Sequence, residues 1–115
     1  MGSVIEELRE WHCDVDGALA RFLDDEGLYT SCLGAVLEDQ AFAGLGEALK
    51  AHEVSEAFDY AHTLKGVLAN MGLTPMFDIA VRIVEPLRAG NDEGLMPIYE
   101  ELLQAKERLA GLLEG

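Results

Sequence analysis

The chain has 115 residues, half of them hydrophobic, which suits one domain with one hydrophobic core. Its 22 acidic residues outnumber 8 basic ones, and the resulting formal net charge of −14 repels phosphate backbones and anionic membranes. We therefore expect a single domain over residues 1–115 that binds neither nucleic acid nor a membrane, with acidic helix faces that keep it in solution.

Strand signals are almost absent, because no apolar/polar alternation is sustained and no Asn-Gly or Asp-Gly separates β-branched runs. The N-terminal part predicts two short helices instead. The first covers Val4 to Trp11. The second begins near Asp16, with Asp14 or Asp16 as its N-cap, and ends in the segment FLDDEG.

Apolar residues then recur at three- and four-residue spacing from Leu28 to Val36, and the pattern resumes from Leu45 to Leu49. A break near Asp39 leaves two alternatives open. This part of the chain forms either one kinked helix or two short helices.

The next predicted helix runs from about Ser55 to Met71, and Gly72 follows it as a typical C-terminal stop. Thr74 and Pro75 then begin another helix, as its N-cap and its first helical residue.

That helix ends near Ala89-Gly90, and Pro86 is expected to kink or weaken its last turn. Asn91 or Asp92 caps the final helix. The apolar face of this last helix consists of Leu95, Tyr99, Leu102, Leu109 and Leu113. Four substantial amphipathic helices with short loops predict an all-α fold, an antiparallel up-down four-helix bundle with a short N-terminal helical appendage.

The segment AHTLKG places one histidine on the outside of the helix from Ser55 to Met71. At about 100° per residue, the core face of that helix is formed by Ala57, Ala61, Leu64, Leu68 and Met71. His62 points roughly 140° away from the centre of this face, so we expect it in solvent. Its neighbours on the helix surface include Phe58, Lys65 and Gly66.

A glycine in the middle of a helix costs about 1 kcal/mol relative to alanine, so Gly66 indicates that another molecule must come close there. A neutral imidazole is nucleophilic near pH 7, and the Lys65 ammonium can offset the charge of a phosphoryl group attached to His62. This pattern favours a phosphoryl carrier. On geometry alone, the alternative that His62 is an ordinary exposed histidine stays open.

The motif also resembles a known family, the histidine-containing phosphotransfer (HPt) domains of bacterial multistep phosphorelays. That family has a helix motif of the form A-H-x-L-K-G, followed by small residues and a turn. The matching residues are His62, Leu64, Lys65, Gly66, Ala69, Asn70 and Gly72. The segments on both sides look like the family's flanking helices, so the resemblance spans nearly the whole chain.

The resemblance implies that His62 accepts a phosphoryl group from a receiver-domain aspartate and passes it to an aspartate on another receiver. It also implies that Lys65 steadies the phosphoryl oxygens and that Gly66 gives the receiver access. The implied partners are response-regulator receiver domains and a hybrid sensor kinase. The chain would be a phosphocarrier without a cofactor, not an autonomous kinase, with Mg²⁺ on the receiver.

One departure from the family pattern concerns the orientation of the imidazole. Many members have a Gln or Glu on the following helix that orients the ring, whereas this chain has Val84 at about that place and Glu85 beside it. That contact can be absent, water-mediated or supplied by Glu85. The departure keeps a second function open, a non-catalytic docking module that binds a receiver or kinase without phosphotransfer.

Apolar residues of the following helix extend beyond its main stripe. Either another helix covers them, or they form a docking patch for a receiver's helix together with residues near His62. The expected partner-binding residues, with two arginines at the edge, are Phe58, Ala69, Leu73, Phe77, Val81, Arg82, Val84 and Arg88.

Other motifs predict no further site. His12 and Cys13 point about 100° apart on a helix, and no second Cys/His pair follows at ligand spacing, so we expect no metal site. His52 has a solvated or capping role in the segment AHEVSE. The segment GLG at 44–46 lacks the strand and the remaining glycines of a nucleotide fingerprint, which argues against ATP binding.

The sequence also gives expectations about cellular setting. No apolar run approaches the roughly 20 residues that span a bilayer, and the start lacks the features of a signal peptide. We expect a cytoplasmic monomer in which Cys13 and Cys32 are reduced thiols. Met1 and the complete set of helices favour a free-standing protein over a segment of a larger sensor.

Overall fold

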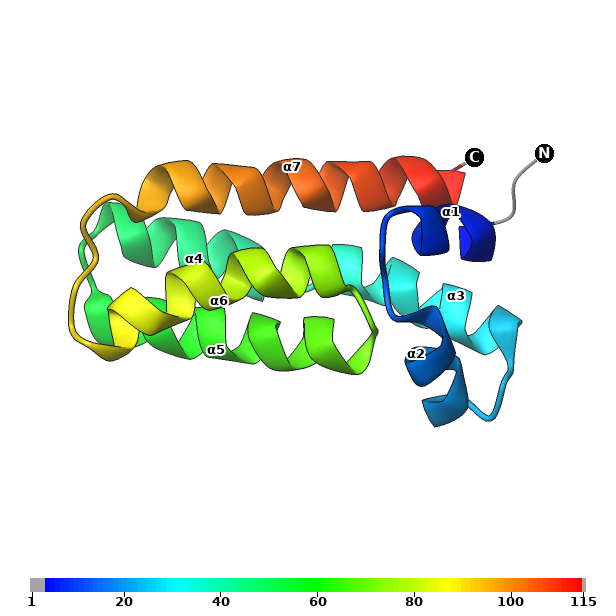
Figure 1. Ribbon diagram of the computed structural model, residues 1–115. Coiled ribbons are helices and arrows are strands. Elements are labelled where there is room, and N and C mark those ends of the chain that lie inside the picture. The colour runs from blue at the N-terminus through cyan, green and yellow to red at the C-terminus, as the bar shows by residue number, and fades with distance from the viewer. Residues whose placement is uncertain (1–3, 115) are drawn as a thin grey trace.

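The computed structural model describes residues 4–114, and all regular structure in that range is helical (Figure 1). The predicted all-helical class is thereby confirmed for these residues. Met1, on which the expectation of a free-standing protein partly depends, lies outside them. The helices are α1 (Val4–Glu10), α2 (Val15–Arg21), α3 (Glu26–Leu37), α4 (Ala41–Lys50), α5 (Val54–Asn70), α6 (Thr74–Arg88) and α7 (Leu95–Glu114).

Helices α4, α5, α6 and α7 lie lengthwise beside one another, while α1 and α2 lie at the end of the molecule where α5 turns into α6 (Figure 1). Contacts join α4 to α5, α5 to α6 and α6 to α7, and α7 also contacts α3, α4 and α1. The molecule is consequently elongated, with extents of 43 × 24 × 21 Å.

One cluster of buried apolar side chains runs through the molecule and receives residues from every helix. The predicted core face of α5 is confirmed, because the buried residues there are Ala57, Ala61, Leu64, Leu68 and, just after the helix, Met71. The predicted face of α7 is buried as well, except that Leu113 is only half-buried.

Two predicted helix boundaries carry a hydrogen bond to an aspartate side chain; one aspartate is the N-cap of α2, and the other precedes Gln40, the N-cap residue of α4. The Asp14 carboxylate caps α2 by accepting a hydrogen bond from the Gly17 N–H at 3.1 Å. Likewise, the Asp39 carboxylate accepts the Ala41 N–H at 2.9 Å, just before α4. The chain therefore forms two short helices around Asp39, and the kinked-helix alternative is wrong.

The predicted cap of α6 is wrong. Leu73 occupies the N-cap position without a side-chain hydrogen bond, and Thr74 is already the first helical residue. The Thr74 hydroxyl donates to the Gly72 carbonyl at 3.5 Å instead of capping the helix. A buried leucine can take the N-cap position because its side chain adds to the core.

The cap predicted for the last helix is wrong as well, because α7 begins only at Leu95. Asp92 instead pairs with His52, whose Nδ1 lies 3.0 Å from the Asp92 carboxylate. His52 follows the end of α4 with a φ of 58° and is exposed, in agreement with its predicted solvated role.

The turn between α5 and α6 is tied to the N-terminal helices. Gly72 has a φ of +69°, and a Cβ there would collide with the Asp14 carbonyl oxygen. The Gly72 carbonyl accepts the Asp14 N–H at 2.8 Å. One residue earlier, the Met71 carbonyl accepts the buried hydroxyl of Tyr29 at 2.8 Å. These bonds hold α2 and α3 against the end of α5.

We expect Tyr29→Phe to lower the free energy of unfolding by about 1–2 kcal/mol near pH 7, because the buried Met71 carbonyl loses its donor. Burial raises the pKa of the Tyr29 phenol from 10.0 to about 12. As the pH rises through that interval, the Tyr29 phenol ionises in the unfolded state before it does so in the folded state. The wild type therefore loses free energy of unfolding there, whereas Tyr29→Phe has no such phenol to ionise. The difference between their urea midpoints should narrow between those pH values, and a constant difference would contradict this reading.

Candidate functional site

His62 lies in the middle part of α5, on the side turned away from the core. The imidazole is exposed, whereas Ala61 and Leu64 beside it in sequence are buried. The predicted solvent exposure of His62 is confirmed, and the helical period alone accounts for it.

The His62 ring stacks on Phe58, which lies one turn earlier on α5. The ring centroids are 5.5 Å apart and the planes meet at 27°. Across residues 4–114, no hydrogen bond joins the imidazole to another residue. Stacking is therefore the specific contact that the fold provides to this ring.

Lys65 and Gly66 occupy the next turn after His62. Lys65 is half-buried and Gly66 is exposed. A Cβ built on Gly66 would meet no heavy atom within 4 Å, whereas a Cβ on Gly46 would collide with the Tyr99 ring. Gly46 is thus required by internal packing. Gly66 is not, since the described structure leaves the space beside it open.

Helix α6 contributes the other side of this surface. The Arg88 guanidinium lies 5.2 Å from the centre of the Phe58 ring, and its Nε lies 3.6 Å from the Glu85 carboxylate. Phe77 and Val81 are half-buried further along the helix. Glu85 has no hydrogen bond to His62 in the described part of the chain, so a direct orienting contact from Glu85 is absent.

Two residues expected in the docking patch are not accessible. Leu73 and Val84 are both 0% exposed, so the prediction that they contact a partner is wrong. Val84 lies four residues after Ala80 and three before Leu87, both of them buried, and thus belongs to the core stripe of α6. Leu73 packs into the same core just before the helix.

Arg82 also lies away from His62, because it faces α7. Its guanidinium donates to both carboxylate oxygens of Glu101, at 2.7 and 3.1 Å. The hydrogen bonds and the opposite charge raise the pKa of Arg82, and the same bonds lower the pKa of Glu101. The Arg82 side chain nevertheless remains about half exposed, so a role for it at the edge of the docking patch stays a prediction.

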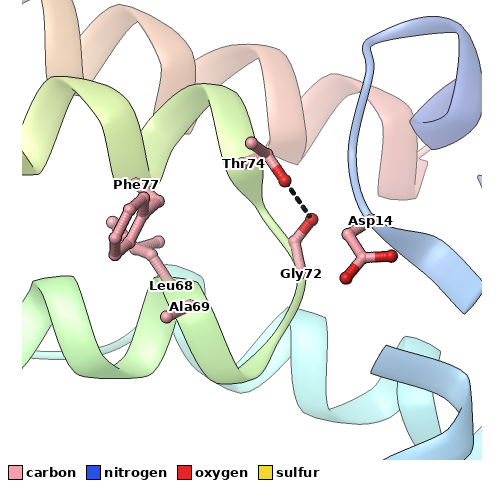
Figure 2. A pocket seen from close by; sticks show the side chains of 6 residues that line it. All are labelled: Asp14, Leu68, Ala69, Gly72, Thr74 and Phe77. Carbon is pink, nitrogen blue, oxygen red and sulfur yellow. Dashed lines mark hydrogen bonds between the residues drawn. The ribbon is translucent and has the colours of Figure 1, made fainter. Parts of the chain in front are cut away.

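A shallow cavity of about 220 Å³ opens where α5 turns into α6 (Figure 2). Figure 2 shows Phe77 of α6 next to Leu68 of α5, with Asp14 across the turn. The lining residues are Asp14, Leu68, Ala69, Gly72, Thr74 and Phe77. The exposed Ala69 continues the face of α5 that carries His62, about 10 Å further along the helix.

Sequence reasoning missed Asp14 and Thr74 as neighbours of this surface. Asp14 is brought there by the packing of α2 against the α5–α6 turn, through its backbone bond to Gly72. No periodic pattern reports a contact between residues so far apart in the chain. In the structure, the positive φ of Gly72 marks the turn against which Asp14 packs.

Both cysteines are free, as expected. Cys13 is buried, and burial raises the pKa of its thiol to about 11. No cluster of three or more His, Cys, Asp or Glu side chains within 4–114 is arranged to hold a metal ion. None of the described helices is long and apolar enough to cross a membrane.

The sequence was compared with protein-family models, curated proteins and solved structures. A family model described as "Hpt domain" matches residues 37–114, about two-thirds of the chain. The matched range contains α4, α5, α6 and α7, and with them His62. No curated protein matches the chain, and no solved structure does.

Proposed function

Because the chain belongs to the Hpt domain family, whose members carry out histidine phosphotransfer in phosphorelays, we propose that His62 is the residue that carries the phosphoryl group. One observation carries the assignment. His62 is an exposed imidazole in the matched range, and it stands on a helix face where the Gly66 position leaves open space. A receiver's active site can approach such a ring without displacing any residue in the range 4–114.

The chemistry needs a neutral ring with one unprotonated nitrogen. The lone pair of that nitrogen attacks phosphorus and forms the P–N bond, while the P–O bond to the receiver's aspartate breaks. The carboxylate leaves with the bonding electron pair, and the other ring nitrogen keeps its hydrogen. Transfer to a second receiver reverses these bonds on another aspartate.

We expect Lys65→Gln to slow transfer to His62 about 10-fold, because an ammonium one helical turn away offsets charge on the phosphoryl oxygens. Lys65→Arg keeps the charge and should retain most of the rate. The rate of label transfer from a phosphorylated receiver measures both variants. Equal rates for wild type and Lys65→Gln would remove Lys65 from the proposed site, while Lys50→Gln, at the end of α4, controls for net charge.

The partners follow from the same chemistry. Members of this family interact with receiver domains and kinases in phosphorelays. We propose that the phosphoryl group arrives from the receiver of a hybrid sensor kinase and leaves to a response-regulator receiver. The Mg²⁺ and the acidic residues that bind it would belong to those receivers.

Finer features of the protein are proposed with this function. Helices α4 to α7 form an antiparallel up-down four-helix bundle, with α1 and α2 as an appendage, and residues 1–115 make one domain. The contiguous hydrophobic core supports both statements. The protein acts as a monomer in the bacterial cytoplasm, which light scattering and cell fractionation test.

The test of the function is transfer of labelled phosphate. The purified chain is mixed with a receiver that carries ³²P on its aspartate, and the label on each protein is followed after rapid separation. The proposal predicts acid-labile, alkali-stable label on this chain. If candidate receivers bind the chain but no label appears on it, the alternative of a docking module without phosphotransfer replaces the carrier.

A further inference from the structure

Phosphoryl transfer requires a defined orientation of the His62 imidazole. No residue in the range 4–114 forms a hydrogen bond that fixes this orientation. An exposed histidine with two free torsions samples several rotamers. In-line attack requires the ring nitrogen to point at phosphorus in one of them. The ring stack on Phe58, at 5.5 Å and 27°, selects among these rotamers.

Phe58 can select a rotamer because it is itself fixed. Its half-buried ring packs against the hydrophobic core. From α6, the Arg88 guanidinium lies over the same ring at 5.2 Å, and the Glu85 carboxylate lies 3.6 Å from Nε of that arginine. The ring that supports His62 is thus held from the neighbouring helix as well as from its own.

We propose that Phe58 is a positioning residue that orients the His62 imidazole for phosphoryl transfer by stacking, and that Arg88 holds Phe58 in place from α6. This inference rests on the proposed role of His62 as the carrier. It assigns Phe58 a role inside the chain that is distinct from the partner contact expected from the sequence. Four residues separate Phe58 from His62, the spacing at which side chains on a helix meet.

A positioning role and a docking role have different kinetic consequences. The stack exists before a receiver arrives, so its loss lowers the transfer rate at saturating receiver. The receiver concentration that gives half of the maximal rate then stays the same. Loss of a docking contact raises that half-saturating concentration, and addition of receiver restores the maximal rate.

The test compares Phe58→Leu, which keeps an apolar side chain but removes the ring, with Phe58→Tyr, which keeps the ring. Phe58→Leu should lower the saturating transfer rate about 3- to 10-fold, whereas Phe58→Tyr should keep the wild-type rate. Arg88→Gln should lower it by a smaller factor. Arg108→Gln is the matched control, since that arginine lies 4.7 Å from the Trp11 ring on a different part of the molecule and should have no effect.

A second measurement needs no partner. Side-chain NMR of the free protein should give one dominant χ1 rotamer for His62, with imidazole protons shifted by the Phe58 ring current, in the wild type and in Phe58→Tyr. Phe58→Leu should lose both features while its thermal melt stays cooperative. Rotamer averaging already present in the wild type would overturn the inference, as would an unchanged saturating rate in Phe58→Leu. If neither the wild type nor any variant is labelled, the carrier role of His62 itself is overturned. The NMR result then still reports whether Phe58 orients the imidazole.

Discussion

His62→Gln is expected to reduce phosphoryl acceptance at least about 1,000-fold, which corresponds to roughly 4 kcal/mol of transition-state stabilisation. The lone pair of a glutamine amide nitrogen is delocalised into the carbonyl group, so it does not attack phosphorus and the P–N bond cannot form. The substitution keeps a polar side chain of moderate size at an exposed position. Label transfer from a ³²P-labelled receiver gives the rate.

His12→Gln and His52→Gln are the matched controls for this experiment. Both histidines are exposed, like His62, but His12 follows α1 and His52 follows α4. Neither change should alter the transfer rate. His62→Gln should remain within about 0.5 kcal/mol of the wild type in free energy of unfolding, because the site is exposed, and all three variants should unfold cooperatively. If His62→Gln is labelled at the wild-type rate and one of the two control variants is not labelled, the histidine replaced in that control is the carrier instead.

Substitution of Gly66 should change stability and activity in opposite directions. Gly66→Ala is expected to raise the free energy of unfolding by about 1 kcal/mol, because alanine favours the helix and its Cβ meets no atom within 4 Å. Gly66→Leu should stay at least as stable as the wild type. It should slow transfer more than about 10-fold, because the larger side chain occupies the space that the receiver enters. Urea unfolding and the label-transfer rate measure the two effects.

Gly111 offers a matched control on α7. It is exposed, and a Cβ there also meets no heavy atom within 4 Å. Gly111→Ala and Gly111→Leu should stabilise the helix by a comparable amount without any effect on transfer. If Gly66→Leu transfers phosphate at the wild-type rate, the open space beside Gly66 has no role in receiver approach.

The helical period explains how much of the site was predictable. The core face of α5 and the exposure of His62 both follow from the spacing of residues within one helix, and this spacing can be read from the sequence. Caps formed by short-range bonds, such as that of Asp14 on α2, were predictable for the same reason. The family resemblance then gave the chemistry that a helical wheel does not contain.

Contacts between helices account for what sequence reasoning missed. A wheel gives the angle of Arg82 on α6, but it does not say that α7 lies on that side, where Arg82 pairs with Glu101. Val84 is different, because its spacing from the buried Ala80 and Leu87 already places it on the core stripe of α6, and its assignment to the docking patch overlooked that spacing. The contact of Arg88 with Phe58 likewise depends on how α6 packs against α5.

The position of the phosphoryl group on the labelled chain distinguishes His62 from every other acceptor. After transfer from a phosphorylated receiver, the protein is kept at alkaline pH, fragmented, and mapped by mass spectrometry. A single phosphoryl group is expected on the imidazole of His62. A phosphoryl group found on His12, on His52 or on a carboxylate, with His62 unmodified, would contradict it.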